Sequence, residues 1–304
     1  MLHTIWGPGM ELREEELLRR EQRNRKYMMD LKSENLLLNY NLVGVRRETI
    51  GNLEAGRYTA AFFPEGIHGG WEAQTCQLRG HFLGHWLSAA AMRYHACGDG
   101  EIKAKADAIV HQLALCQEEN GGQWVGAIPE KYLYWIGRGK QVWAPQYNLH
   151  KILMGLVDQY ELAGNQEALA VADRFADWFC QWSAGYTREQ FDDILDFETG
   201  GMLEVWAQLL QHTGAEKYRT LLQRYYRQRL FTPLLEGKDV LTNMHANTTI
   251  PEVLGCARAY EVTGEQRWRD IVEAYWKLAV DQRGQYATGG QTSGGSGSTA
   301  DENQ

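Results

Sequence analysis

Positive charge, long apolar runs and cysteine are all scarce in this sequence of 304 residues. The 31 Lys and Arg residues are outnumbered by 39 Asp and Glu residues, which gives a formal net charge of −8. A nucleic-acid groove or an anionic membrane surface needs a basic face, so neither partner is expected. No apolar run approaches the ~20 residues that span a bilayer. The first ten residues lack the basic start and apolar stretch of a secretion signal. We therefore expect a cytoplasmic protein.

The five cysteines form no Cys-x-x-Cys pair and are widely spread: Cys76, Cys97, Cys116, Cys180 and Cys256. An odd number at such spacings predicts neither a disulfide framework nor a cysteine-type zinc knuckle. All but the first fall in helical patterns or at their ends, where a thiol usually serves as a small buried group. No metal site is expected from these residues.

Apolar and aromatic residues are plentiful. Hydrophobic residues make up 44% of the chain, which is enough for a sizeable core. The sequence also has 11 Trp and 15 Tyr. Many of them belong to the core, but so many flat aromatic faces on an acidic protein are also typical of sugar binding by stacking.

A repeated phrase ends in glycine at Gly98, Gly164, Gly214 and Gly264, at intervals of 66, 50 and 50 residues. Each phrase ends one apolar pattern of helical period and precedes another. A glycine just past the last periodic residue is typical of a left-handed helix end. The sequence thus predicts a series of helical hairpins. A single hairpin cannot bury its apolar faces, so the hairpins must stack, as an open solenoid or as a ring.

The rest of the chain fits this all-α scheme. Residues 11–41 predict one long helix and a short second one, and the glycine- and serine-rich residues 288–304 predict a disordered tail. Three long segments between the repeats predict irregular chain at the end opposite the glycines: 119–147, 185–200 and 237–249. These loops carry Trp, Tyr, His and Glu, and a ligand site is expected there.

Two motifs suggest chemistry near the first repeat. Trp71 and Glu72 follow two glycines, and His81 and His85 lie one helical turn apart. Two such histidines can share a metal, but the metalloprotease pattern needs Glu after the first His, where Phe82 stands. A packed or hydrogen-bonded histidine pair is the favoured interpretation.

Three further motifs each open a predicted helix. Tyr147 and His150 follow Pro145, and Glu204 follows two glycines in a first turn, where the helix dipole favours a carboxylate whatever its function. His245 and Asn247 precede Pro251, and Asn247, Thr248 or Thr249 is expected to cap that helix. These motifs run in sequence as WAPQYNLH, GGMLE and MHANTTIP.

Seven phrases in fixed order resemble the β-L-arabinofuranosidases, glycoside hydrolase family 127, also called domain of unknown function 1680. They are GGWE, LRGHFLGHWLSA, WAPQYNLHKIL, YELAGNQEALAVADRFADW, GGMLEV, HANTTIPEV and YATGGQTSG, and the resemblance covers residues 10–294. It implies a catalytic (α/α)6 toroid of six helical hairpins, followed by β-sandwich domains. It also implies a retaining glycosidase with a zinc-held cysteine thiolate as nucleophile and a glutamate as acid/base.

The resemblance also implies that part of this machinery is missing here. The position expected to hold the acid/base glutamate is Gly295, and no cysteine lies where the nucleophile and zinc ligands are expected. We therefore expect a truncated and inactive enzyme. The toroid would span residues 1–287 and be incomplete at its C-terminal end, without β-sandwich domains or zinc. Its uncovered helices at 11–41 and 268–280 would favour self-association.

The substrate would be a plant-derived, arabinose-containing glycan. The residues carried over as substrate-binding are Trp71, Glu72, His81, His85, Tyr147, His150, Glu204, His245 and Asn247. Two alternatives remain open. One is a sugar epimerase that uses His150 and His245 as acid and base, and the other is a non-catalytic carbohydrate-binding remnant or helical scaffold.

Overall fold

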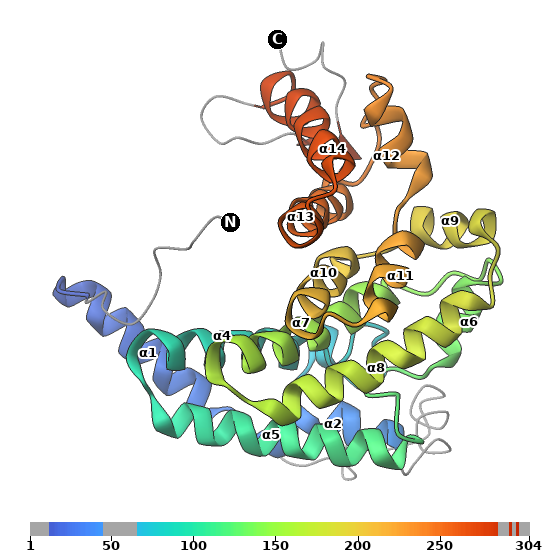
Figure 1. Ribbon diagram of the computed structural model, residues 1–304. Coiled ribbons are helices and arrows are strands. Elements are labelled where there is room, and N and C mark those ends of the chain that lie inside the picture. The colour runs from blue at the N-terminus through green and yellow to red at the C-terminus, as the bar shows by residue number, and fades with distance from the viewer. Residues whose placement is uncertain (1–11, 45–65, 285–291, 294–295, 298–304) are drawn as a thin grey trace. The chain divides into compact units, whose positions relative to one another are not determined.

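The computed structural model describes residues 12–44, 66–284, 292–293 and 296–297, and these are helical over most of their length (Figure 1). The first helices are α1 (Glu15–Asp30), α2 (Ser33–Gly44), the 3-10 turn η2 (Gly70–Glu72), α4 (His81–Cys97), α5 (Gly100–Glu119) and α6 (Lys131–Ile136). They are followed by α7 (Pro145–Ala163), α8 (Gln166–Ala184), α9 (Arg188–Phe197), α10 (Met202–Thr213), α11 (Glu216–Arg224) and α12 (Gln228–Leu235). The last elements are α13 (Ala246–Thr263), α14 (Gln266–Trp276), the π-turn η3 (Lys277–Asp281) and the paired strands β1 (Thr292–Ser293) and β2 (Ser296–Gly297).

The chain forms two compact units. Unit 1 comprises Met1–Tyr134 and Gln141–Trp178, and unit 2 comprises Trp135–Lys140 and Phe179–Gln304. Each unit has its own buried core. Aromatic side chains such as Trp124 and Phe175 fill the core of unit 1, and Trp206 and Tyr225 fill that of unit 2.

The four glycine-ended phrases form the tips of four helical hairpins, as predicted. Gly98, Gly164, Gly214 and Gly264 have φ values of 66° to 70°, and each donates its backbone N–H to a carbonyl four residues earlier. Glycine adopts this left-handed conformation without steric cost. At two of the four tips a polar side chain caps the next helix: Asp99 accepts the N–H of Ile102, and Asn165 accepts the N–H of Ala168. The resulting pairs are α4–α5, α7–α8, α10–α11 and α13–α14.

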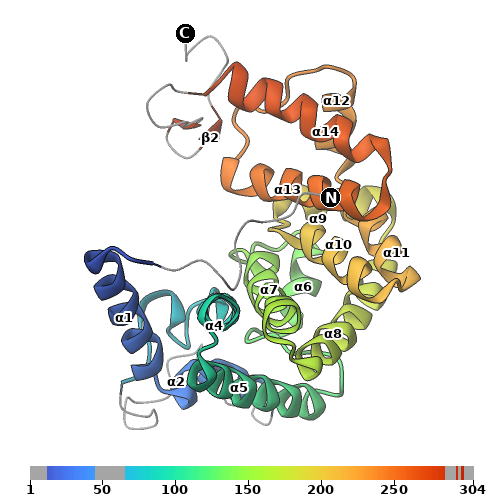
Figure 2. The same cartoon turned by 60° about the vertical axis from the view of Figure 1, so that its left-hand side comes forward.

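In unit 1 the first helices of two hairpins, α4 and α7, lie side by side (Figure 2). Their crossing is close because it is made by glycines. A Cβ on Gly84 would stand 2.0 Å from the carbonyl oxygen of Lys151, and one on Gly155 would stand 2.6 Å from the carbonyl oxygen of Gly84. The two backbones therefore touch, and α4 and α7 hold a fixed register.

Unit 2 repeats this arrangement with one glycine. Helices α10 and α13 pack together where a Cβ on Gly255 would stand 2.7 Å from Leu203 Cβ. Behind them, Arg227 bonds Asp196 Oδ1 with its Nε (2.7 Å) and Glu252 Oε2 with its Nη1 (3.0 Å). The Arg227–Glu252 pair is buried, and Arg227 ties the start of α12 to α9 and α13.

Two details differ from the predicted irregular segments. Residues 131–136 and 188–197 are helical, as α6 and α9. In α9 the Thr187 hydroxyl accepts the N–H of Gln190, whose side chain bonds the N–H of Thr187 in return. This capping box starts a helix that buries Phe191 and Leu195. The prediction of irregular chain at 188–197 is therefore wrong, because it overlooks the capping box.

The predicted division into a toroid over 1–287 and a tail over 288–304 stays a prediction, because most of the tail lies outside the described residues. No helix in the described part of the chain is long and apolar enough to cross a membrane.

Candidate functional site

The loop of residues 66–80 in unit 1 carries the first predicted site residues, and side chains from α2 and α7 hold its backbone. The hydrogen bonds run from Asn35 to Gly66 O (2.8 Å), from Asn39 to Glu72 O (3.1 Å), from Tyr40 Oη to Gly80 O (2.8 Å), and from Asn148 Nδ2 to Leu78 O (2.7 Å) and Arg79 O (2.8 Å). The loop ends at Gly80, which has φ 89° and where a Cβ would lie 2.1 Å from that of Ala127. Only glycine fits there, so the approach of the loop to α4 is fixed.

Glu72 closes the start of α4. Its carboxylate accepts the backbone N–H of Gly80 (2.7 Å) and of Phe82 (3.0 Å), which satisfies donors that a helix start leaves open. The same carboxylate bonds His81 Nδ1 (2.6 Å), and that nitrogen also lies 2.9 Å from Leu78 O. With two acceptors at Nδ1, that nitrogen carries a proton, and Nε2 is the ring atom left for a ligand.

His81 and His85 differ in charge preference although their ring centroids are 6.0 Å apart. Burial acts to lower the pKa of His81, but the hydrogen bond and negative charge of Glu72 outweigh it and raise that pKa. The pKa of His85 is lowered, first by burial and then by the positive charges of Lys151 and His81. Relative to a free histidine, His81 therefore holds its proton more tightly and His85 holds it less tightly.

His150 is buried one turn into α7, and the described residues offer no hydrogen-bond partner to its Nδ1. Burial, followed by the charges of Lys151 and His85, lowers its pKa to about 3. His150 is therefore a neutral imidazole at physiological pH. The Lys151 ammonium lies 4.5 Å from the ring centroid of Tyr147, whose own centroid is 6.2 Å from that of His81. These contacts, together with the electrostatic effect of His85 on His150, gather Tyr147, His81, His85 and His150 in what we call the histidine cluster.

Two tryptophans border this cluster. The ring of Trp71 lies 6.2 Å from that of His81 and 6.0 Å from that of Trp143, and the two indoles are nearly perpendicular. Both are exposed, by 62% and 50%. Trp143 stands in the WAPQYNLH motif but is not among the residues that the sequence predicted for the site. We call Trp71 and Trp143 the tryptophan corner.

The structure thus brings together six of the nine predicted residues: Trp71, Glu72, His81, His85, Tyr147 and His150. Glu204, His245 and Asn247 belong to unit 2. Glu204 is half-buried in the first turn of α10, and His245 and Asn247 are exposed at the start of α13. The cap expected from Asn247, Thr248 or Thr249 is wrong. The N-cap position is His245, which makes no side-chain cap bond, and the Thr249 hydroxyl bonds Tyr275 Oη (2.9 Å).

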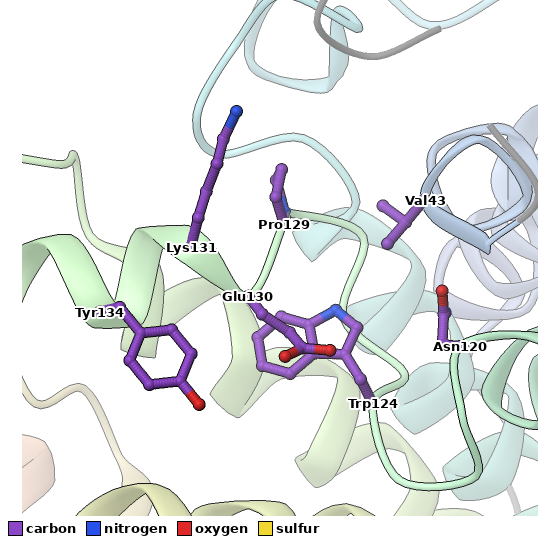
Figure 3. Close-up of a pocket in the computed structure, with 7 residues that line it drawn as sticks. All are labelled: Val43, Asn120, Trp124, Pro129, Glu130, Lys131 and Tyr134. Carbon is purple, nitrogen blue, oxygen red and sulfur yellow. The ribbon is translucent and has the colours of Figure 1, made fainter. Parts of the chain in front are cut away.

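A separate pocket of about 350 Å³ lies in unit 1 (Figure 3). It is lined by Val43, Asn120, Trp124, Pro129, Glu130, Lys131 and Tyr134, and none of these is a predicted site residue. The Trp124 indole is nearly inaccessible, and its N–H donates to Ile128 O (3.1 Å). The pocket therefore presents the edge of a packed core and not a free aromatic face.

The zinc centre that the resemblance implies does not fit the described residues. They contain no group of three His, Cys, Asp or Glu side chains placed to hold a metal ion. Burial raises the pKa of Cys116 to about 11 and that of Cys256 well above its usual range, so neither thiol is a thiolate at neutral pH. Gly295, the expected acid/base position, lies outside the described residues.

Comparison with models of protein families identifies one family for this chain. Residues 11–302 match the family model described as "Beta-L-arabinofuranosidase, GH127 catalytic domain". A crystal structure of Ara127N, a GH127 β-L-arabinofuranosidase from Geobacillus stearothermophilus T6, aligns with TM-score 0.54 and 16% identity over 93% of this chain and 45% of that one. The GH127 β-arabinofuranosidase BT3674 aligns with TM-score 0.48 and 15% identity over 87% of this chain and 42% of that one. No match is found among curated protein sequences.

The chain thus spans less than half the length of these two structures. The likeness to the first structure concerns the fold, and it confirms the predicted all-α, α/α-toroid fold class. That the ring is incomplete stays a prediction.

Proposed function

The chain belongs to the β-L-arabinofuranosidase GH127 catalytic-domain family, and from this premise we propose that it binds the terminal arabinofuranosyl group of plant-derived glycans. The observation that carries the proposal is the cluster of Tyr147, His81, His85 and His150 at the starts of α4 and α7. Imidazole nitrogens and a phenol are groups that bond sugar hydroxyls, and the buried Nδ1 of His150 has no hydrogen-bond partner among the described residues.

Glu72 supports this site without being free to act in it. Its carboxylate is occupied by two backbone N–H groups and by His81. Glu72 is therefore proposed as a positioning residue that holds His81, with Nε2 of His81 turned to the sugar. Glu204, His245 and Asn247 remain proposed sugar contacts on unit 2.

We propose further that this chain by itself binds but does not cleave. Retaining cleavage needs both a nucleophile and an acid/base group. Glycine stands at position 295, where the resemblance expects the glutamate, and the described thiols are buried or scattered. The epimerase alternative has less support, because a general acid or base works best with a pKa near the working pH, and that of His150 is lowered to about 3.

The test is to titrate the chain with methyl β-L-arabinofuranoside in a calorimeter and to incubate it with an aryl β-L-arabinofuranoside, with zinc and with a chelator. We expect binding that His150→Ala abolishes, and no release of the aryl alcohol in either condition. The exposed His111→Ala, far along α5, serves as the matched control. Cleavage in either condition would contradict the proposal, as would the absence of binding.

A further inference from the structure

The tryptophan corner is unusual because two of the largest apolar side chains stand exposed beside one another. Trp71 and Trp143 are exposed by 62% and 50%, while Trp86, Trp124 and Trp206 are each at most 2% exposed. Single exposed apolar residues need no explanation, but adjacent ones on a folded surface commonly mark a binding site.

The backbone at both residues is fixed although the side chains are not buried. Trp71 lies in the turn η2, directly before the helix-capping Glu72. The N–H of Trp143 donates to Gln77 Oε1 (2.7 Å), which ties it to the same 66–80 loop. Ala144, the next residue, has the left-handed φ of 47°, which a residue with a side chain rarely adopts. Such conformations persist where the surroundings enforce them, and they concentrate at functional sites.

The shape of the corner fits one kind of ligand. The ring planes of the two indoles meet at 86°, so the two rings present aromatic surfaces at nearly a right angle to each other. A sugar ring has an apolar C–H face that packs on an aromatic ring. The hydroxyl groups around the sugar ring need polar partners. His81, whose ring lies 6.2 Å from that of Trp71, and His85 beside it supply such partners at the edge of the corner.

From this geometry we propose that Trp71 and Trp143 form a subsite for a second sugar residue, the one to which the terminal arabinofuranosyl group is linked. The inference rests on the proposed function, since the first sugar would occupy the histidine cluster that His81 shares with the corner. The protein would then recognise di- and oligosaccharides better than a single arabinofuranoside, because the stacked residue adds affinity that the terminal residue cannot provide.

The experiment compares binding of methyl β-L-arabinofuranoside with that of a β-linked arabinofuranosyl disaccharide, by calorimetry on the full chain. We expect the disaccharide to bind about three- to tenfold more tightly, which is the range of one good aromatic contact. Trp71→Ala and Trp143→Ala should each lower the affinity for the disaccharide more than the affinity for the methyl glycoside, and so remove most of this difference. Trp71→Phe should retain part of it.

Trp276→Ala is the matched control, because Trp276 is exposed by 58% and lies on α14 in unit 2. Saturation transfer from protein to sugar protons should reach the second residue in the wild type and fade in Trp71→Ala. Equal affinity for the two sugars would contradict the proposed subsite but not the proposed function. A disaccharide affinity that neither substitution changes would do the same. If neither sugar binds, the proposed function fails together with it. If Trp71→Ala lowers the free energy of unfolding and leaves the affinity unchanged, the corner is a packing surface and the subsite is wrong.

Discussion

The two units bury different kinds of polar group. In unit 1 the buried polar side chains are mostly neutral amides that bond backbone carbonyls, such as Gln117 to Val171 O (2.9 Å) and Gln159 to Leu87 O (2.7 Å). In unit 2 they are mostly charged, with Arg227, Glu252 and Arg283 as the main examples. Amide bonds to the backbone fix loops at all pH values, whereas buried charges depend on their partners and on protonation. The unit that carries the histidine cluster is thus held by the contacts least sensitive to conditions.

The largest expected effect on stability comes from breaking the buried charge pair Arg227–Glu252 of unit 2. Arg227→Met leaves Glu252, which is 2% exposed, without its cation. At about pH 9, where the wild-type Glu252 carboxyl is ionised, we expect a loss of about 3–5 kcal/mol in the free energy of unfolding, the usual cost of removing one partner of a buried charge pair. Urea denaturation measures it. The double variant Arg227→Met with Glu252→Leu should recover much of the loss, and a single-variant cost below about 1 kcal/mol would show that the pair is not buried as described.

The second effect is a pH dependence of the free energy of unfolding, and it comes from the same pair. Burial raises the pKa of Glu252 to about 7 from a usual value near 4.5, against the opposing pull of Arg227. A raised folded-state pKa means that the folded chain holds this proton more tightly than the unfolded chain. The stability that it contributes is therefore complete below about pH 4.5 and lost as pH rises through about 7.

Over this pH range the contribution of Glu252 to the free energy of unfolding changes by about 3 kcal/mol. Unfolding experiments from pH 4 to 8 on the wild type and on Glu252→Gln, in which this slope should vanish, provide the measurement. Parallel curves for the two proteins would contradict it.

The third effect concerns the glycine crossing of unit 1. Gly84→Ala places a methyl group 2.0 Å from the Lys151 carbonyl oxygen, and a backbone atom cannot rotate away as a side chain does. We expect a loss of about 2–3 kcal/mol in the free energy of unfolding. Gly100→Ala, where a Cβ meets nothing within 4 Å, is the matched control and should be neutral or slightly stabilising. Equal stability of the two variants would argue against the close α4–α7 contact.

The smallest effect tests the contact between Glu72 and His81 in the histidine cluster. Glu72→Gln weakens the cap of α4 and removes the charge beside His81, at a cost of about 1–2 kcal/mol. The pKa of His81 should fall, because only the hydrogen bond to the Leu78 carbonyl then opposes the effect of burial. In the wild type the raised pKa means that the pair stabilises the fold at low pH and ceases to do so as pH rises through that pKa. Titration of the His81 ring protons by NMR, in the wild type and in Glu72→Gln, measures this pKa. The same pKa in both proteins would rule out the contact.

Local signals in the sequence predict the hairpins well. A glycine after an apolar helical pattern, as at Gly164, requires only its own neighbours to adopt the left-handed end. The Glu72–His81 contact is not predictable in this way, because nine residues separate the two and the turn that joins them depends on Gly80 and on donors from α2 and α7. The sequence favours a packed or hydrogen-bonded histidine pair, and His81 is hydrogen-bonded in the structure.

Two further residues show why the rest could not be predicted. Trp143 projects beside Trp71 because Gln77 and the left-handed Ala144 set its backbone, and neither depends on a recognisable motif. Glu252, in contrast, has a signal that is easily missed. It lies four residues before Cys256 and seven before Ala259 on the buried stripe of α13, where a carboxylate is out of place without a partner.

The glycine crossing of α4 and α7 has a consequence for how this protein tolerates change. Where main chain meets main chain, the alignment of two helices does not depend on the identity of the surrounding side chains. We therefore expect that residues near the helix starts, such as His85 and Lys151, can be exchanged without a shift of the two helices that carry them. A redesign of the proposed sugar site would therefore best keep Gly84 and Gly155 and vary the positions around them.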